Sequence, residues 1–255
     1  MKFSTLNLLF LIFFSSLLFS CDKNDIDPNN GGIVTDIDGN KYHTVTIGFQ
    51  VWMVENLKTT RFRNGDPIPY INQLPKYGYG GYGYEVETTA GYCNYDDNDE
   101  IASKYGRLYN WFAVKDEREI APEGWHIPTK DEWEELAAYA QANTQPNSSV
   151  AKDLAAKTDW VISTLPGTIG NDLSLNNSTG FTALPGGMLI INEYEGLRAT
   201  TNWWCSDDSF DVIGDDVIPA AYYFRMDFGE YDYSRELKRR ITTLDYSLSV
   251  RCLKD

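Results

Sequence analysis

The stretch GWHIPTKDEWEELAAYAQAN, residues 124–143, contains the clearest structural signal in the chain. Pro128 prevents an upstream helix from running through it, and Thr129 is a typical helix N-cap residue. Glu132 stands three residues after Thr129, which completes a capping box. Apolar residues then follow with helical spacing at Trp133, Leu136, Ala137 and Ala140. The sequence therefore predicts a helix over residues 130–143 with one face in a hydrophobic core.

Strand signals stand on both sides of this helix. Asp38-Gly39-Asn40 is a hairpin turn signal between two β-rich runs. We expect further strands at residues 50–55, 202–206, 221–228 and 247–253, and short helices at residues 107–114 and 149–157. No second linker interrupts residues 33–255, and 14% of all residues are aromatic. These features predict one α+β domain that is rich in strands and loops.

The N-terminus has the features of a secretory signal. Residues 1–20 contain one early lysine, Lys2, followed by an apolar run from Leu8 to Phe19 that is short for a membrane span. The run ends in Leu18-Phe19-Ser20-Cys21, which resembles the lipobox of bacterial lipoproteins. The sequence thus predicts a signal peptide over residues 1–20 and lipidation of Cys21, whose acyl chains would hold the protein on a membrane.

Residues 21–32 are polar and acidic and contain Gly and Pro, which predicts a flexible tether. Acidic residues directly after the lipidated cysteine resemble the surface-export signal of Bacteroidota lipoproteins. We therefore expect a lipid-anchored outer-membrane protein that is exposed on the cell surface, with a periplasmic orientation as the alternative.

The chain is strongly acidic, with a formal net charge of −15. Nucleic acid is disfavoured as a partner because phosphate contacts require a basic surface. Cation binding is permitted, and calcium prefers oxygen ligands on irregular loops. The run Asp96, Asp97, Asp99 and Glu100 is the candidate calcium site, and a solvated acidic loop is the alternative.

Three cysteines follow Cys21, namely Cys93, Cys205 and Cys252. An oxidising compartment favours one disulfide and one free thiol. Three pairings are possible, and of these we favour Cys205–Cys252.

Several segments together resemble one family, the Fibrobacter succinogenes major paralogous domain. They are Asp38–Gly48, Gln50–Leu57, Tyr109–Trp111, Gly124–Trp133, Gly180–Gly187, Trp203-Trp204 and the terminal Ser249–Asp255. The family is similar to the formylglycine-generating-enzyme and C-type-lectin-like folds. The resemblance implies a domain of twisted antiparallel strands with about two helices and long loops. The family often has Cys-Pro where this chain has Ala121-Pro122, which leaves Cys205 as a possible substitute partner for Cys252.

A catalytic constellation is not evident in the sequence. Formylglycine-generating enzymes hold copper with two nearby cysteines, whereas Cys205 and Cys252 are far apart in this chain. The two histidines, His43 and His126, fit packing or backbone contacts better than a nucleophile–base pair. Carboxylate pairs that could hydrolyse a glycan are expected by chance among 37 acidic residues.

Aromatic residues are the candidates for ligand binding. Adjacent strand residues face opposite sides, so we expect one of Trp203 and Trp204 in the core. The other is either buried as well or exposed and able to stack on a sugar or a protein. Tyr79, Tyr82 and Tyr84 lie in a Tyr/Gly-rich loop that suits an adaptable recognition surface.

These observations favour a surface-anchored, non-catalytic module that binds a glycan or a cell-surface protein. A diverged oxidase or glycan hydrolase on the same fold is one alternative. A structural or assembly lipoprotein without a small ligand is the other.

Overall fold

A computed structural model describes residues 31–71, 89–190, 193–213, 216–229, 235–244 and 246–255. This part of the chain is a mixed α+β fold of mostly antiparallel strands with four α-helices. The helices are α1 (Asp99–Tyr105), α2 (Trp111–Val114), α3 (Lys130–Asn143) and α4 (Val150–Leu154). None of the described helices is long and apolar enough to cross a membrane.

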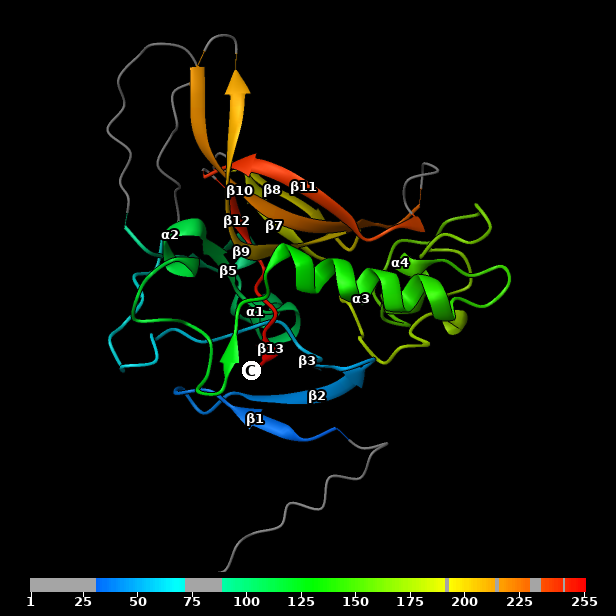
Figure 1. The fold of residues 1–255 in the computed structure, drawn as a ribbon, viewed down its shortest axis with the longest axis horizontal. Coiled ribbons are helices and arrows are strands. Elements are labelled where there is room, and N and C mark those ends of the chain that lie inside the picture. The colour runs from blue at the N-terminus through cyan, green and yellow to red at the C-terminus, as the bar shows by residue number, and fades with distance from the viewer. Residues whose placement is uncertain (1–30, 72–88, 191–192, 214–215, 230–234, 245) are drawn as a thin grey trace, which may run out of the picture.

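The strands form two sheets (Figure 1). The small sheet has the order β1-β2-β3-β13-β6, formed by β1 (Ile33–Thr35), β2 (Lys41–Ile47), β3 (Gln50–Met53), β13 (Leu253–Lys254) and β6 (Trp125–His126). The large sheet has the order β11-β10-β9-β7-β12-β5-β4, and β8 pairs with β7. Its strands are β4 (Tyr92–Cys93), β5 (Leu108–Asn110), β7 (Gly186–Ile190), β8 (Glu193–Leu197), β9 (Thr200–Ile213), β10 (Asp216–Asp227), β11 (Lys238–Thr243) and β12 (Tyr246–Leu248).

The predicted turn at Asp38-Gly39-Asn40 is confirmed as the connection between β1 and β2. Gly39 has a φ of 85°, a conformation that glycine adopts without the steric cost of a side chain. Asp36 closes the turn because its Oδ1 accepts hydrogen bonds from the backbone N–H groups of Asp38 and Asn40. The hairpin is therefore specified locally by the sequence of the turn.

The predicted helix over residues 130–143 is confirmed as α3. Both halves of the capping box are present, since Thr129 caps Glu132 N–H and Glu132 accepts from the Thr129 N–H. The Trp133 ring lies 4.7 Å from that of Trp52 on β3, and 5.3 and 5.5 Å from those of Trp203 and Phe224 on β9 and β10. One face of α3 thus contacts both sheets.

Two expected elements differ from the structure. Residues 107–114 were expected to be one helix, but β5 precedes a single helical turn, α2. The side chains of β5 are all buried and the strand pairs with β12, so sheet pairing overrides local helix propensity. Residues 247–253 were expected to be one strand, but they divide into β12 and β13 because the chain passes from the large sheet to the small one.

We predict that Thr129→Ala lowers the free energy of unfolding by about 1 kcal/mol, because it leaves the Glu132 N–H without its capping oxygen. Urea unfolding would measure the change. Glu135→Ala on the exposed face of α3 is the control and should change stability by less than about 0.5 kcal/mol. Equal effects of the two variants would contradict the capping role.

Candidate functional site

A cleft of about 210 Å³ lies beside the β1–β2 turn. Its lining residues come from the turn, from the segment after β3 and from the segment before β6: Thr35, Asp36, Ile37, Thr59, Arg63, Ile120, Ala121, Pro122 and Glu123. The cleft therefore combines two acidic groups, a basic group and two hydroxyls, which is the composition from which a small polar site could be built.

The Asp36 carboxylate is already fully engaged. Besides the two turn N–H groups, its Oδ2 accepts hydrogen bonds from the Tyr42 hydroxyl at 2.6 Å and from Asn40 Nδ2 at 2.9 Å. Tyr42 in turn accepts a hydrogen bond from the Lys58 N–H. Burial and the neighbouring Asp36 charge raise the pKa of Tyr42, so that its hydroxyl stays protonated as a donor. Asp36 therefore organises the turn.

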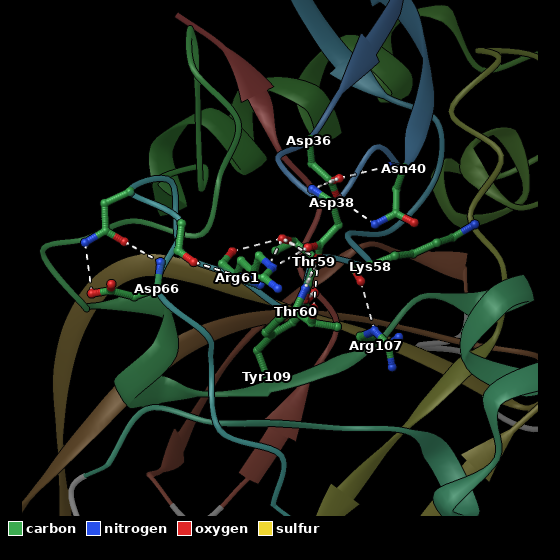
Figure 2. Close-up of polar contacts among 12 residues, drawn as sticks. Asp36, Asp38, Asn40, Lys58, Thr59, Thr60, Arg61, Asp66, Arg107 and Tyr109 are labelled. Atoms are coloured by element: carbon green, nitrogen blue, oxygen red, sulfur yellow. Dashed lines mark hydrogen bonds and ion pairs between the residues drawn. The ribbon is translucent and has the colours of Figure 1, made fainter.

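Asp38 connects the same turn to the segment after β3, as Figure 2 shows. Its Oδ2 accepts from the backbone N–H and the hydroxyl of Thr60, and its Oδ1 lies 3.2 Å from Arg61 Nε. Below this contact, the Tyr109 hydroxyl donates to the Thr59 carbonyl, and Arg107 Nε donates to the Lys58 carbonyl. These hydrogen bonds hold residues 58–61 between the small sheet and β5.

Arg63 also lines the cleft, and its guanidinium is held by several acceptors. Its Nε donates to the Ala121 carbonyl, its Nη2 donates to the carbonyls of Pro122 and Trp125, and its Nη1 pairs with Glu119. Asp36 and Arg63 of the cleft are therefore used to hold segments together, and Glu123 is the exposed carboxylate at its rim. The cleft offers space for a small molecule, but among its described lining residues the one carboxylate not held in a contact, Glu123, has no nucleophile or histidine beside it in the lining.

A second polar cluster lies in the core and centres on Arg251. Arg251 is 1% exposed, and its Nε and Nη2 both donate to Asn56 Oδ1, at 3.1 and 2.9 Å. Its Nη1 donates to the Phe181 carbonyl at 2.6 Å, and its Cζ lies 4.3 Å from the centre of the Phe181 ring. Burial lowers the pKa of Arg251 to about 9, which leaves the guanidinium charged at neutral pH.

Asn56 is the acceptor that makes this cluster possible. Its Oδ1 also accepts a hydrogen bond from Trp203 Nε1, and its Nδ2 donates to the Tyr105 carbonyl. The cluster thus joins five segments: the residues after β3, the end of α1, the turn containing Phe181, β9, and the link between β12 and β13. Four of these segments contain the sequences that resemble the family, so those sequences build the core.

Trp203 and Trp204 are both 0% exposed. The Trp203 ring lies in the hydrophobic cluster with Trp133 and Phe181, and the Trp204 ring lies in the other main cluster with Trp111 and Tyr223. The alternative in which both are buried is confirmed, and the expectation that one could stack on a ligand is wrong. β9 is covered on both faces at this point, which the alternation of side chains along a strand cannot reveal.

The two histidines each contact carboxylates at the surface. His126 lies between Asp255 Oδ1, 2.7 Å from its Nδ1, and Glu132 Oε1, 3.0 Å from its Nε2. His43 Nδ1 lies 2.7 Å from Glu55 Oε1. Neither histidine has a serine or cysteine as a hydrogen-bond partner, so neither belongs to a nucleophile–base pair among the described residues.

Cys93, Cys205 and Cys252 are free and buried thiols. The expected Cys205–Cys252 disulfide is therefore not formed, because Cys205 packs in the cluster with Trp203 while Cys252 packs in the cluster with Trp204. Burial raises the pKa of all three thiols, that of Cys93 to about 12. Buried protonated thiols are poor nucleophiles and poor metal ligands.

The acidic run Asp96, Asp97, Asp99 and Glu100 does not converge on a point. Asp97 accepts a hydrogen bond from the Tyr70 hydroxyl, and Asp99 accepts one from Asn94 Nδ2. Asp99 and Glu100 lie in the first turn of α1, where negative charge favours the helix. Nowhere in the described ranges are three His, Cys, Asp or Glu residues placed to hold a metal ion, so the geometry does not support the calcium site.

Tyr79, Tyr82, Tyr84 and Cys21 lie outside the described residues. Their roles as recognition residues and as the lipidated cysteine stay predictions from the sequence.

One group of exposed apolar residues in the described chain was not expected from the sequence. Beyond their pairing with the rest of the sheet, β9 and β10 continue as a two-stranded projection (Figure 1). We call residues 208–213 and 216–219 the ribbon. Phe210, Val212 and Val217 are 69%, 66% and 65% exposed. The signal that could have revealed the ribbon is Gly214-Asp215 between two β-branched runs, which is a hairpin turn pattern.

A model of the protein family described as the Fibrobacter succinogenes major domain matches residues 45–254. This match covers most of the chain, so the chain belongs to that family. No curated protein and no solved structure matched the chain.

We predict that iodoacetamide does not alkylate Cys93, Cys205 or Cys252 in the folded protein, because each thiol is buried and protonated. After denaturation without a reductant, mass spectrometry should find all three alkylated. If only one of them is alkylated until a reductant is added, the chain contains a disulfide and the free-thiol assignment is wrong.

We also predict that Asn56→Ala lowers the free energy of unfolding by more than about 3 kcal/mol, because it leaves a buried guanidinium and an indole N–H without their acceptor. Asn56→Asp keeps an acceptor oxygen and should lose less stability than Asn56→Ala. The exposed Asn64→Ala is the control for loss of an asparagine side chain. Equal unfolding midpoints for Asn56→Ala and Asn64→Ala would refute the role of the cluster.

Proposed function

We propose that this member of the Fibrobacter succinogenes major domain family is a lipid-anchored, non-catalytic module that binds a protein at the cell surface. The observation that supports it most directly is the ribbon, which exposes apolar side chains on a rigidly rooted projection. Contiguous exposed apolar surface on a folded domain commonly marks a site of association.

The absence of available catalytic groups supports a binding role. In the described ranges, the thiols are buried, the histidines contact carboxylates, and Asp36 and Arg63 of the cleft hold backbone segments. An enzyme of the oxidase or hydrolase type needs a free nucleophile, base or metal site in an open pocket.

The side chains on the ribbon favour a protein over a glycan. Binding of a sugar ring typically uses exposed aromatic faces, but Trp203 and Trp204 are buried and the ribbon offers one aromatic residue, Phe210. Its neighbours Val212 and Val217 are aliphatic and suit the apolar core of a protein interface. The glycan alternative therefore depends on tyrosines outside the described residues.

The positions of β1 and the ribbon suit a domain that is anchored at its N-terminus and presents the ribbon to a partner. β1, where the described strands begin, lies at one end of the molecule in Figure 1, and the ribbon projects at the other end. An acyl chain on Cys21 would hold the β1 end near the membrane and leave the ribbon directed away from it. We also propose the finer fold assignment, similarity to the C-type-lectin-like and formylglycine-generating-enzyme folds, on the basis of the resembling motifs.

We predict that a photo-crosslinking amino acid in place of Phe210 forms a discrete adduct with another protein on intact cells. The same amino acid in place of Ile162, which is also 69% exposed, is the matched control and should form no such adduct. A soluble fragment of residues 33–255 should bind no glycan on an array, with or without calcium.

Three outcomes would contradict the proposal. Binding to a glycan on the array would show that the ligand is a glycan and not a protein. Identical adducts from positions 210 and 162 would show that the ribbon has no specific role in binding. An unacylated Cys21 in the native protein, detected by mass spectrometry, would remove the anchor.

A further inference from the structure

The exposed side chains of the ribbon lie on one face. Phe210 is paired across the strands with Pro219, and Val212 is paired with Val217. Cross-strand partners and residues two apart along a strand share a face of a sheet. Phe210, Val212, Val217 and the exposed Pro219 therefore form a continuous apolar face.

The root of the ribbon is fixed to the body of the domain. The Ser206 N–H donates to the Pro128 carbonyl, and Asp207 Oδ2 accepts from the Lys130 N–H at the start of α3. Lys115 Nζ donates to the Ser206 carbonyl and lies 3.5 Å from Asp208 Oδ2. Because these contacts end at residue 208, the apolar face is held in a defined direction without being covered.

The edges of the ribbon are open among the described residues. β11 pairs with β10 only at residues 220–225, and β7 pairs with β9 only at Thr201. Pro219 removes a backbone donor from the β10 side, whereas residues 207–213 of β9 contain no proline. The β9 side is therefore the edge that retains its full set of backbone hydrogen-bonding groups.

The charge of the ribbon region limits what can dock there. Residues 206–219 contain five Asp and no Lys or Arg. Asp211 lies on the face opposite Phe210 and Val212, since it alternates with them along β9, and it has no ion pair in the described part of the chain. A second copy of this chain would bring like charges together, so a basic partner is favoured.

We infer that the β9 edge of the ribbon binds an extended segment of a partner protein in which apolar and basic residues alternate. The segment would add a strand to the ribbon by backbone hydrogen bonds. Its apolar side chains would lie beside Phe210 and Val212, and its basic side chains would lie beside Asp211 on the other face. This inference rests on the proposed function and names the chemistry of the protein that is bound.

The test uses the full chain in detergent and short synthetic peptides. A peptide of alternating Lys and Val should bind, whereas peptides of alternating Glu and Val or Lys and Ser should bind at least about tenfold more weakly. Combining Val212→Thr with Val217→Thr should weaken Lys/Val binding by about tenfold, because threonine keeps the strand but removes apolar contact. Ile241→Thr on β11, which replaces a residue that is 45% exposed, should leave the affinity unchanged.

N-methylated peptides separate strand addition from non-specific attraction. In a paired strand only alternate amides face the partner, so methylating one alternate set should abolish binding and methylating the other set should not. Loss of binding with both sets, or with neither, would overturn strand addition.

Three further outcomes would overturn the inference. Equal binding of the Lys/Ser and Lys/Val peptides would show attraction by net charge alone. A concentration-dependent dimer that Val212→Thr and Val217→Thr remove would identify a second copy as the occupant. If position 210 forms adducts on cells but the Lys/Val peptide does not bind, the proposed protein-binding function is supported and this partner chemistry is refuted.

Discussion

The fold depends on a positive charge that is buried without a carboxylate partner. A guanidinium in a low-dielectric interior requires oxygen acceptors in fixed positions, because leaving its donors unsatisfied costs several kilocalories per mole. Arg251 obtains them from Asn56 and the Phe181 carbonyl, and its flat face lies against the Phe181 ring. The segments that provide these groups are remote in sequence. They can satisfy the charge only when both sheets are assembled, which couples the sheets into one cooperative unit.

Lys152 repeats this arrangement elsewhere in the fold. Its ammonium donates to the carbonyls of Asn171 and Asp172 and to Asn176 Oδ1, and burial lowers its pKa. Here too the cation fixes one conformation of a connecting segment, residues 171–176, whose only regular structure is a short 3-10 helix at Leu173–Leu175. Buried cations solvated by neutral oxygens thus order the loops that make up much of the domain, and this is a structural use of charge.

The sequence specified those features that are set by neighbouring residues. The Thr129–Glu132 capping box and the Asp38-Gly39-Asn40 turn were predictable because their partners lie within a few positions of each other. The burial of both Trp203 and Trp204 was not predictable, since it depends on α3 covering one face of β9 and α2 covering the other. For the same reason the separate packing of Cys205 and Cys252 could not be read from their spacing. The ribbon was not predicted because its sequence pattern is the same as that of any pair of strands. Only the structure shows that β7 and β11 do not pair with β9 and β10 along the ribbon, so that its edges are exposed.

The buried core and the exposed ribbon differ in what they can contribute to function. The core cluster consists of four residues in segments that resemble the family: Asn56, Phe181, Trp203 and Arg251. Their side chains face inward and satisfy one another's hydrogen-bonding groups, so the cluster can support different surfaces without taking part in recognition. The ribbon contributes little to this core, yet it exposes apolar area and open backbone groups that folded proteins usually cover or charge. Its aspartates and Pro219 disfavour pairing with the ribbon of a second copy, and the β9 edge stays available. An edge that is protected from its own copies but open to a basic strand is better explained by selection for a partner than by the requirements of folding.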